Sequence, residues 1–179
     1  MSRESLLDGA VEHFAKNGIG DASLRSIAAS IGTSHRMLIY HFGSREGLLA
    51  EVVRTVEAQQ RDLLAMLSEK DLPLAEQAEQ FWRLVTEAAL IYGPLFFELS
   101  AHAMQDLPHT EALKADLINV WLPPLIDLCI RAGLPPDDAP AYARLGLAAS
   151  RGLLFDLLLT GDRTGVDAAS DLLNKLFTP

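Results

Sequence analysis

The sequence predicts an all-α protein of about nine helices, with a three-helix unit in residues 1–48 and a larger helical body in residues 49–179. Three observations support this fold. Apolar residues recur at helical spacing along most of the chain. Glycine and proline separate these periodic segments from one another. Hydrophobic residues make up 49% of the 179 residues, which is enough for a packed core.

The first helix is predicted over residues 5–16, where an apolar stripe runs from Leu6 to Phe14. Ser5 is its predicted N-terminal cap, and Gly18 is its predicted end. Because one face of this helix is strongly apolar, we expect it to brace the two short helices that follow.

Residues 23–45 predict two short helices joined by a tight turn. Gly32 ends the first of them, because glycine adopts the left-handed conformation without a Cβ penalty. Thr33 and Ser34 supply hydroxyl groups that can cap the second helix. Helix, glycine turn and helix together form the pattern of a helix-turn-helix.

The second helix of this pair has two distinct faces. Leu38 and Phe42, four residues apart, form its apolar face. Arg36, Met37 and Tyr40 fall on the opposite side of the helical wheel. In a helix-turn-helix, the second helix lies in the DNA major groove with its N-terminal residues at the base edges. The sequence therefore predicts binding of a double-stranded DNA operator through this outer face.

The same segment has a characteristic order of short runs. They are Leu24-Arg25-Ser26-Ile27-Ala28, Gly32-Thr33-Ser34, Leu38, Tyr40-His41-Phe42, Ser44-Arg45-Glu46 and Leu48-Leu49. This order resembles the DNA-binding end of the TetR family of bacterial transcriptional regulators, over about the first third of the chain. The resemblance implies a sequence-specific, ligand-responsive dimeric repressor with an effector-binding and dimerisation domain after the helix-turn-helix.

Ten residues are candidates for DNA contact. Seven match positions that the family uses on the DNA backbone, where hydroxyls, cations and helix N-termini bind phosphate. These seven are Ser23, Arg25, Thr33, Ser34, Tyr40, His41 and Arg45. Arg36, with His35 and Met37, is the candidate for base reading, because Arg prefers guanine and Met can contact a thymine methyl. The plainer alternatives are a solvated Arg36 and a half-buried Tyr40 ring.

The net charge of −9 by itself argues against a nucleic-acid partner. Its distribution changes this interpretation. Residues 1–48 contain five basic and five acidic residues, so the whole excess of acid lies after them. Three arginines gather in the helix-turn-helix segment. Because this basic surface is small, we expect modest non-specific affinity for DNA.

A long helix is predicted over residues 44–68, capped by Ser44, and would reach from the first unit into the body. Five further helical segments follow: 73–92, 95–105, 111–132, 138–160 and 162–177. We expect Gly93-Pro94 to end the first of these, Thr110 to cap the third, and Pro123-Pro124 to kink or break it. The last two carry excess apolar surface, and the resemblance implies that they form a homodimer interface.

Aromatic and embedded polar side chains gather in the predicted helices of the body. A buried polar group without a partner costs about 1–3 kcal/mol, so embedded polar groups suggest a binding role. A plain core remains the alternative for the aromatic residues. We expect a largely apolar small-molecule effector with one or two polar contacts. The candidate ligand-binding residues are Phe81, Trp82, Phe97, His102, Trp121, Arg151 and Phe155.

Several kinds of site find no support in the sequence. The single Cys129 excludes an internal disulfide and a cysteine-based zinc site. The five histidines lack metal-binding spacing, and no phosphate loop or nucleophile elbow is present. We therefore predict no metal, no cofactor and no enzymatic activity. No signal peptide is visible and no uncharged apolar run approaches the ~20 residues of a membrane span, so we expect a cytoplasmic protein without membrane contact.

Two other function classes stay open. An all-α enzyme or small-molecule-binding protein with an incidental helix-turn-helix would bring catalytic polar residues together in the body and would not bind DNA. A protein-interaction adaptor using the apolar helix at 138–160 would dimerise only with its partner. The specific run around Tyr40-His41-Phe42 favours the regulator.

Overall fold

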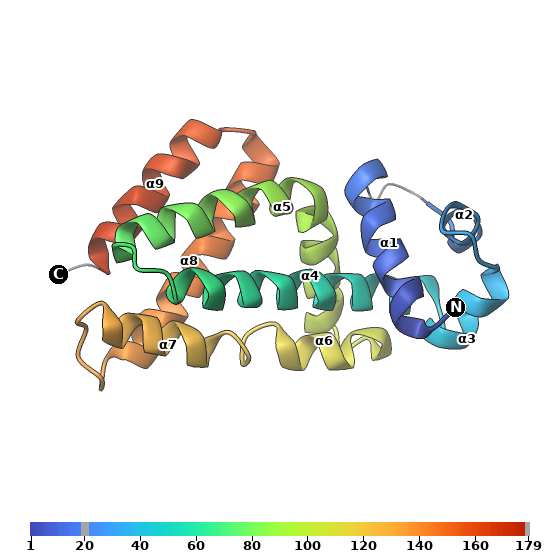
Figure 1. The fold of residues 1–179 in the computed structure, drawn as a ribbon, viewed down its shortest axis with the longest axis horizontal. Coiled ribbons are helices and arrows are strands. Elements are labelled where there is room, and N and C mark those ends of the chain that lie inside the picture. The colour runs from blue at the N-terminus through green and yellow to red at the C-terminus, as the bar shows by residue number, and fades with distance from the viewer. Residues whose placement is uncertain (19–21, 178–179) are drawn as a thin grey trace.

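The computed structural model describes residues 1–18 and 22–177 and confirms the all-α fold. Helices α1 to α3 form a head, α5 to α9 form the body, and α4 runs from one into the other (Figure 1). The helices of the described residues are α1 (Arg3–Asn17), α2 (Leu24–Ser30), α3 (His35–Phe42), α4 (Arg45–Ser68), α5 (Leu74–Met104), α6 (Glu111–Asp116), α7 (Leu122–Arg131), α8 (Ala139–Thr160) and α9 (Arg163–Leu176), with a 3-10 turn at Pro108–Thr110.

Helix α1 braces the head as expected, because Leu6, Ala10 and Phe14 are fully buried against its neighbours. Its N-terminal cap differs from the prediction. Ser2, not Ser5, is the cap, and its Oγ accepts a hydrogen bond of 3.1 Å from the Ser5 amide. The helix therefore begins one turn earlier, where Ser2 lies at the right spacing for the first free amides.

Helix α4 is 24 residues long and starts at the predicted Ser44 cap. Its first half carries a buried stripe, including Leu48, Val52 and Val53, that packs in one cluster with head residues and with Leu95 of α5. The predicted domain boundary at residue 48 lies within this helix and this shared core. One continuous core therefore joins the head, the first half of α4 and Leu95 of α5.

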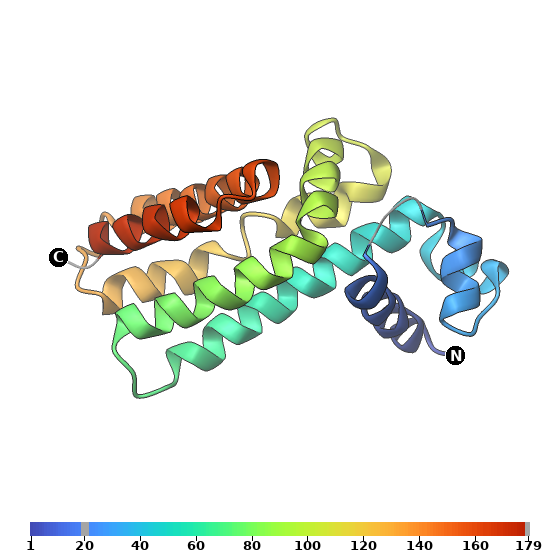
Figure 2. The same cartoon turned by 90° about the horizontal axis from the view of Figure 1, so that it is seen from above.

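Helix α5 corrects one prediction. Gly93-Pro94 does not end it, since the helix continues through Pro94 to Met104. Figures 1 and 2 show that α5 bends and then turns across α4. Proline removes one helical hydrogen bond and clashes with the preceding turn, which bends a helix when packing holds both halves. A β-carbon on Gly93 would lie 2.6 Å from Cδ1 of Leu158, so α5 and α8 approach closely at the bend.

The length of α5 bears on the prediction that the protein makes no membrane contact. Among the described helices, α5 is the one whose length and apolar composition could cross a membrane. The core helix of a soluble protein meets the same test, and α5 packs against α1, α4, α6, α8 and α9. Glu87 and Glu98 interrupt the apolar stretch of α5, so no uncharged run of ~20 residues is visible in the sequence.

The segment after α5 is broken earlier than predicted. Helix α6 ends at Asp116, and α7 begins at Leu122 with Pro123 in its first turn. Proline fits there because the first-turn amides have no helical partner. Thr110 does not cap α6 through its side chain. Its hydroxyl donates instead to the Leu107 carbonyl at 2.7 Å.

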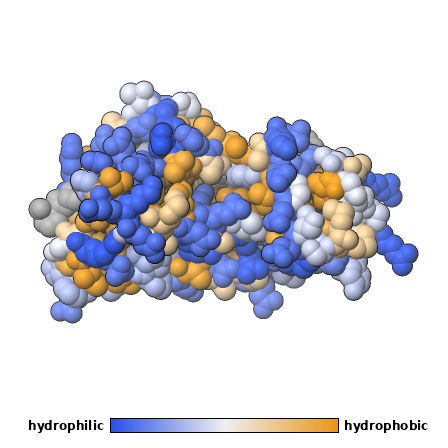
Figure 3. All heavy atoms as spheres, in the orientation of Figure 1, coloured by the Kyte–Doolittle hydropathy of each residue, from blue (hydrophilic) through white to orange (hydrophobic). Residues whose placement is uncertain are grey.

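Helices α8 and α9 form an antiparallel hairpin, with Gly161 in the left-handed conformation and Asp162 as the cap of α9. Figure 2 shows this hairpin along one side of the body, opposite α4. Its outer surface carries exposed apolar side chains at helical spacing, and they form what we call the α8–α9 face: Leu145, Phe155, Leu159, Leu172 and Leu176. The side of the molecule seen in Figure 3 is covered largely by hydrophilic residues, with apolar residues in separate patches.

Candidate DNA-binding surface and ligand cavity

Helix α3 presents one polar and one buried face. Leu38 is fully buried and Phe42 nearly so, and together they fix the helix against the head. Tyr40 is 79% exposed, and Arg36 is exposed beside it. The Ser34 Oγ accepts a hydrogen bond of 3.2 Å from the Met37 amide, which caps the N-terminus of the helix. This arrangement agrees with the two faces that the sequence predicts.

The remaining DNA candidates lie around α3 in the head, on α2, on the turn and at the start of α4. Ser23 and Arg25 are exposed at the N-terminus of α2, where the Ser23 Oγ accepts from the Ser26 amide. Thr33 is half-buried, His35 is exposed, and Met37 and His41 are half-buried. All ten candidates belong to the end of the molecule away from the body (Figure 1).

Arg45, predicted to contact DNA phosphate, also has a structural contact within the head. Its Nε donates a hydrogen bond of 2.9 Å to the Ala22 carbonyl, so this guanidinium also joins the start of α4 to the start of α2. The chain from Ala22 to Arg45 contains three arginines and no acidic residue. The head therefore offers a local positive surface although the whole chain is acidic, and such a surface suits phosphate.

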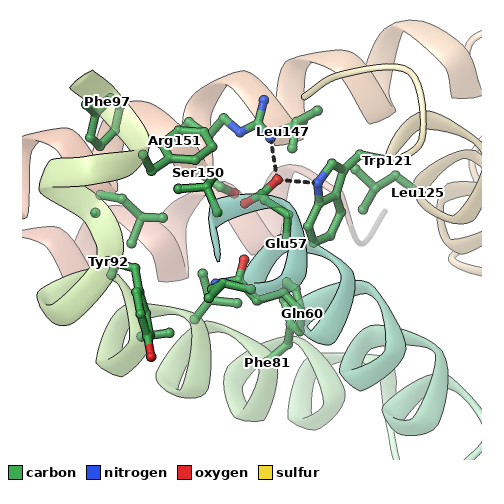
Figure 4. Close-up of a pocket in the computed structure, with 18 residues that line it drawn as sticks. Glu57, Gln60, Phe81, Tyr92, Phe97, Trp121, Leu125, Leu147, Ser150 and Arg151 are labelled. Carbon is green, nitrogen blue, oxygen red and sulfur yellow. Dashed lines mark hydrogen bonds and ion pairs between the residues drawn. The ribbon is translucent and has the colours of Figure 1, made fainter. Parts of the chain in front are cut away.

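A cavity of about 110 Å³ lies between α4, α5, α8 and the start of α7. Aromatic and aliphatic side chains form most of its wall, and Glu57, Gln60, Ser150 and Arg151 are the polar residues (Figure 4). The mixture of apolar walls with a few polar groups is typical of small-molecule sites.

Glu57 is the central polar residue of this cavity, and it is 8% exposed. Its Oε2 accepts hydrogen bonds from the Trp121 Nε1, at 2.7 Å, and from the Arg151 Nη2, at 3.1 Å. Burial raises the pKa of the Glu57 carboxyl above its ordinary value, and Arg151, Trp121 and Arg61 offset only part of this increase. Two donors on one oxygen favour the ionised carboxylate, which forms a buried ion pair with Arg151.

Glu57 is not among the ligand-binding residues that the sequence predicts, although its position carries a signal. Glu57 follows Val53 by four residues and precedes Leu64 by seven, so it occupies the apolar face of α4. A carboxylate at such a position needs a partner, because an unpaired buried charge is costly. Its partner Arg151 lies 94 residues away, and only the folded chain brings the two together.

Four of the predicted ligand residues line this cavity: Phe81, Phe97, Trp121 and Arg151. Three do not. The Trp82 indole donates to Asp167 at 2.9 Å, and Phe155 lies outside, with its ring against Phe97 at 5.3 Å between centroids. His102 pairs with His109 at 3.1 Å near the C-terminal end of α5.

A second cavity, of about 410 Å³, lies under the α8–α9 hairpin, between α5 and α7. Trp82 and Tyr142 belong to its wall, together with Cys129, whose thiol is free and buried. The two cavities adjoin one another, and the wall residues that they share are Phe81, Val85, Leu125, Leu147 and Ser150.

Tyr92 connects the first cavity with the head. Its ring lines the cavity, and its hydroxyl donates a hydrogen bond of 2.9 Å to the Val11 carbonyl of α1. Figure 4 shows the hydroxyl directed away from Glu57. Burial raises the pKa of the Tyr92 hydroxyl, so it remains a proton donor. The residue lies directly before Gly93-Pro94, where α5 bends.

Comparison with known proteins gives the context for these features. The family model for bacterial regulatory proteins of the tetR family matches residues 6–52. The HTH-type transcriptional regulatory protein RaaS of Mycobacterium tuberculosis is 40% identical over 165 residues, which cover 90% of this chain and 74% of RaaS. The HTH-type transcriptional repressor AcnR of Corynebacterium diphtheriae is 29% identical over 65 residues, or 36% of this chain and 34% of AcnR.

Solved structures share the fold over the whole chain. A TetR transcriptional regulator from Legionella pneumophila has a TM-score of 0.72 at 18% identity, covering 98% of this chain and 97% of the other. A TetR transcriptional regulator from Streptomyces coelicolor has a TM-score of 0.66 at 24% identity, with 99% of both chains covered. The head, the long α4 and the helical body recur together in these proteins. With the motif in residues 23–45 and the identity to RaaS, this chain belongs to the TetR family of bacterial transcriptional regulators.

Proposed function

We propose that this regulator represses transcription as a homodimer that binds a DNA operator through two heads and releases it when a small effector enters the body. The observation that carries the proposal is α3, with Leu38 and Phe42 buried and Arg36 and Tyr40 exposed. An exposed cation and phenol on the second helix of a helix-turn-helix suit base and phosphate contacts. The regulator would act in the cytoplasm, where the operator lies, and without catalysis.

In this proposal the operator contacts are divided between two groups. Arg36, with His35 and Met37, reads base edges in the major groove. Hydroxyls and cations around it hold the phosphates, namely Ser23, Arg25, Thr33, Ser34, Tyr40, His41 and Arg45. A gel shift with the DNA upstream of the protein's own gene tests this assignment, and salt-independent or absent binding would contradict it.

Arg36→Ala should weaken operator binding by about 1–3 kcal/mol and relax the base preference at one position of each half-site, because a bidentate contact to guanine is lost. The measurement is a gel shift against operator variants. Arg83→Ala is the matched control, since Arg83 is exposed on α5 of the body, outside the head. Equal preference among operator variants for Arg36→Ala and wild type would remove Arg36 from base reading.

The effector would bind the cavity around Glu57, and the head would respond through two routes. One is α4, which carries Glu57 and continues into the head. The other is Tyr92, which joins the cavity wall to α1 through Val11. An effector that favours a body state with displaced heads must weaken operator binding, and the operator must weaken effector binding by the same factor.

Tyr92→Phe keeps the ring in the cavity wall and removes only the hydrogen bond to the head. The free energy of unfolding should fall by about 1 kcal/mol, which is the usual net value of one such bond. Exchange of α1 amides should quicken, as followed by hydrogen–deuterium exchange, because α1 loses a contact with α5. Tyr142→Phe, in the wall of the second cavity, serves as control. Unchanged α1 exchange in Tyr92→Phe would exclude this route.

A further inference from the structure

We propose that the cavity around Glu57 takes a small, neutral aromatic compound that carries one hydrogen-bond donor, a molecule of the phenol type. This inference rests on the proposed effector site and specifies the ligand class for it. Size, wall chemistry and the charges around Glu57 each restrict the choice.

The size of the cavity limits the ligand to about one ring. Its volume is about 110 Å³. An apolar protein cavity of about 150 Å³ accommodates benzene, so a single ring already fills a space of this size. The larger second cavity adjoins this space and shares part of its wall, including Phe81 and Leu147.

The walls favour an aromatic ring over an aliphatic one. Five aromatic side chains border the space: Phe81, Tyr92, Phe96, Phe97 and Trp121. They come from α5 and from the turn before α7, and they already contact one another edge to face, as Phe81 does with Trp121 and Phe96 with Phe97. Aromatic rings gain from such edge-to-face contacts beyond the area that they bury.

The carboxylate of Glu57 offers one oxygen to the ligand. The hydrogen bonds from Trp121 and Arg151 both end on Oε2, and in the part of the chain that the structure describes none ends on Oε1. Among the described residues, the fully buried side-chain atoms without a hydrogen-bond partner are Nη1 of Arg61 and Oε1 of Gln77. The Oε1 of Glu57 is not one of them, so this oxygen is open to the cavity. An acceptor in this position is satisfied by an O–H or N–H group of a ligand.

The charges around the carboxylate disfavour an ionic ligand. Arg151 pairs with Glu57, and the guanidinium of Arg61 lies 5.7 Å from the centroid of the Trp121 ring. A cationic ligand would therefore meet two guanidinium groups near the one carboxylate. An anionic ligand would face Oε1 of Glu57 directly. A neutral donor satisfies Oε1 without adding a charge to a buried site.

The test is isothermal titration of the full chain with four ligands of similar size, namely phenol, toluene, benzoate and benzylamine. Phenol should bind about tenfold more tightly than toluene, because only phenol can donate to Oε1. Benzoate and benzylamine should bind more weakly than phenol. Glu57→Gln should lose most of the preference for phenol over toluene while still binding toluene, and its toluene binding reports an intact cavity.

The matched control is Glu87→Gln, since Glu87 is exposed on α5 outside the cavity wall and should leave the phenol preference unchanged. Equal affinity for phenol and toluene, tighter binding of benzoate or benzylamine, or no binding of any of the four would overturn the inference. Operator binding is measured by gel shift on the same preparation. Intact operator binding without phenol preference overturns the ligand class alone, whereas absent operator binding overturns the proposed function whatever the titration gives.

Discussion

Leu159→Asp combined with Leu172→Asp should make the protein monomeric and weaken operator binding by a factor of about 10² to 10⁴, the usual gain from joining two binding modules. The reason is the α8–α9 face. Leu159 is 70% exposed and Leu172 61% exposed, and both belong to apolar stripes on the outside of the hairpin. Apolar surface of this kind marks an interface, and two heads reach successive major grooves only when the bodies are joined.

Light scattering and a gel shift measure the two effects separately. Because both leucines are exposed in the single chain, the aspartates should leave the helical circular dichroism unchanged. Met66→Asp is a matched control, since Met66 is 51% exposed on α4, away from the hairpin. A dimer that persists in the double aspartate variant would assign the homodimer interface to another face.

The second large effect concerns the buried ion pair. Glu57→Leu should lower the free energy of unfolding by about 3–5 kcal/mol, because Arg151 is then left without its partner in a low-dielectric environment. The side chains of Glu57 and Arg151 are 11% and 17% exposed, so solvent screens the pair little. Urea unfolding at one fixed protein concentration measures the change, since the stability of a dimer depends on concentration.

The double variant Glu57→Leu with Arg151→Met tests whether the loss of stability comes from leaving one charge unpaired. With both charges removed, the loss should be clearly smaller than in Glu57→Leu alone, because apolar replacements of a buried ion pair are often close to neutral. Glu51→Leu, at a more exposed position of the same helix, should cost far less. If the stability losses of Glu57→Leu alone and Arg151→Met alone add up to the loss of the double variant, Glu57 and Arg151 do not interact in solution.

The sequence was most informative where the determinants of structure are local. Ser34 and Ser44 each cap the helix that follows them, and Gly32 closes the turn at a positive φ of 69°. These features need only neighbouring residues, which a pattern reports directly. The same holds for the two faces of α3, because helical spacing alone divides Leu38 and Phe42 from Arg36 and Tyr40.

Prediction of the body was less complete because its determinants are distant in sequence. The sequence around Pro94 predicts the end of a helix. Packing against α4 and α8 nevertheless keeps α5 continuous and bent. Helical spacing alone does not show whether an aromatic residue lines a cavity or packs in the core. Four of the seven proposed ligand residues line the cavity, whereas Trp82, Phe155 and His102 lie elsewhere.

By itself, then, the amino-acid sequence determined the all-α class, the helix-turn-helix and the outward direction of Arg36 and Tyr40, because each follows from spacing and caps within a few residues. Only the tertiary structure decided which polar groups meet in the interior. Glu57 finds Trp121 and Arg151, and Tyr92 finds Val11, across 64, 94 and 81 residues of chain. Such contacts form because buried donors and acceptors must be paired once helices pack, and the choice of partner depends on how the helices cross.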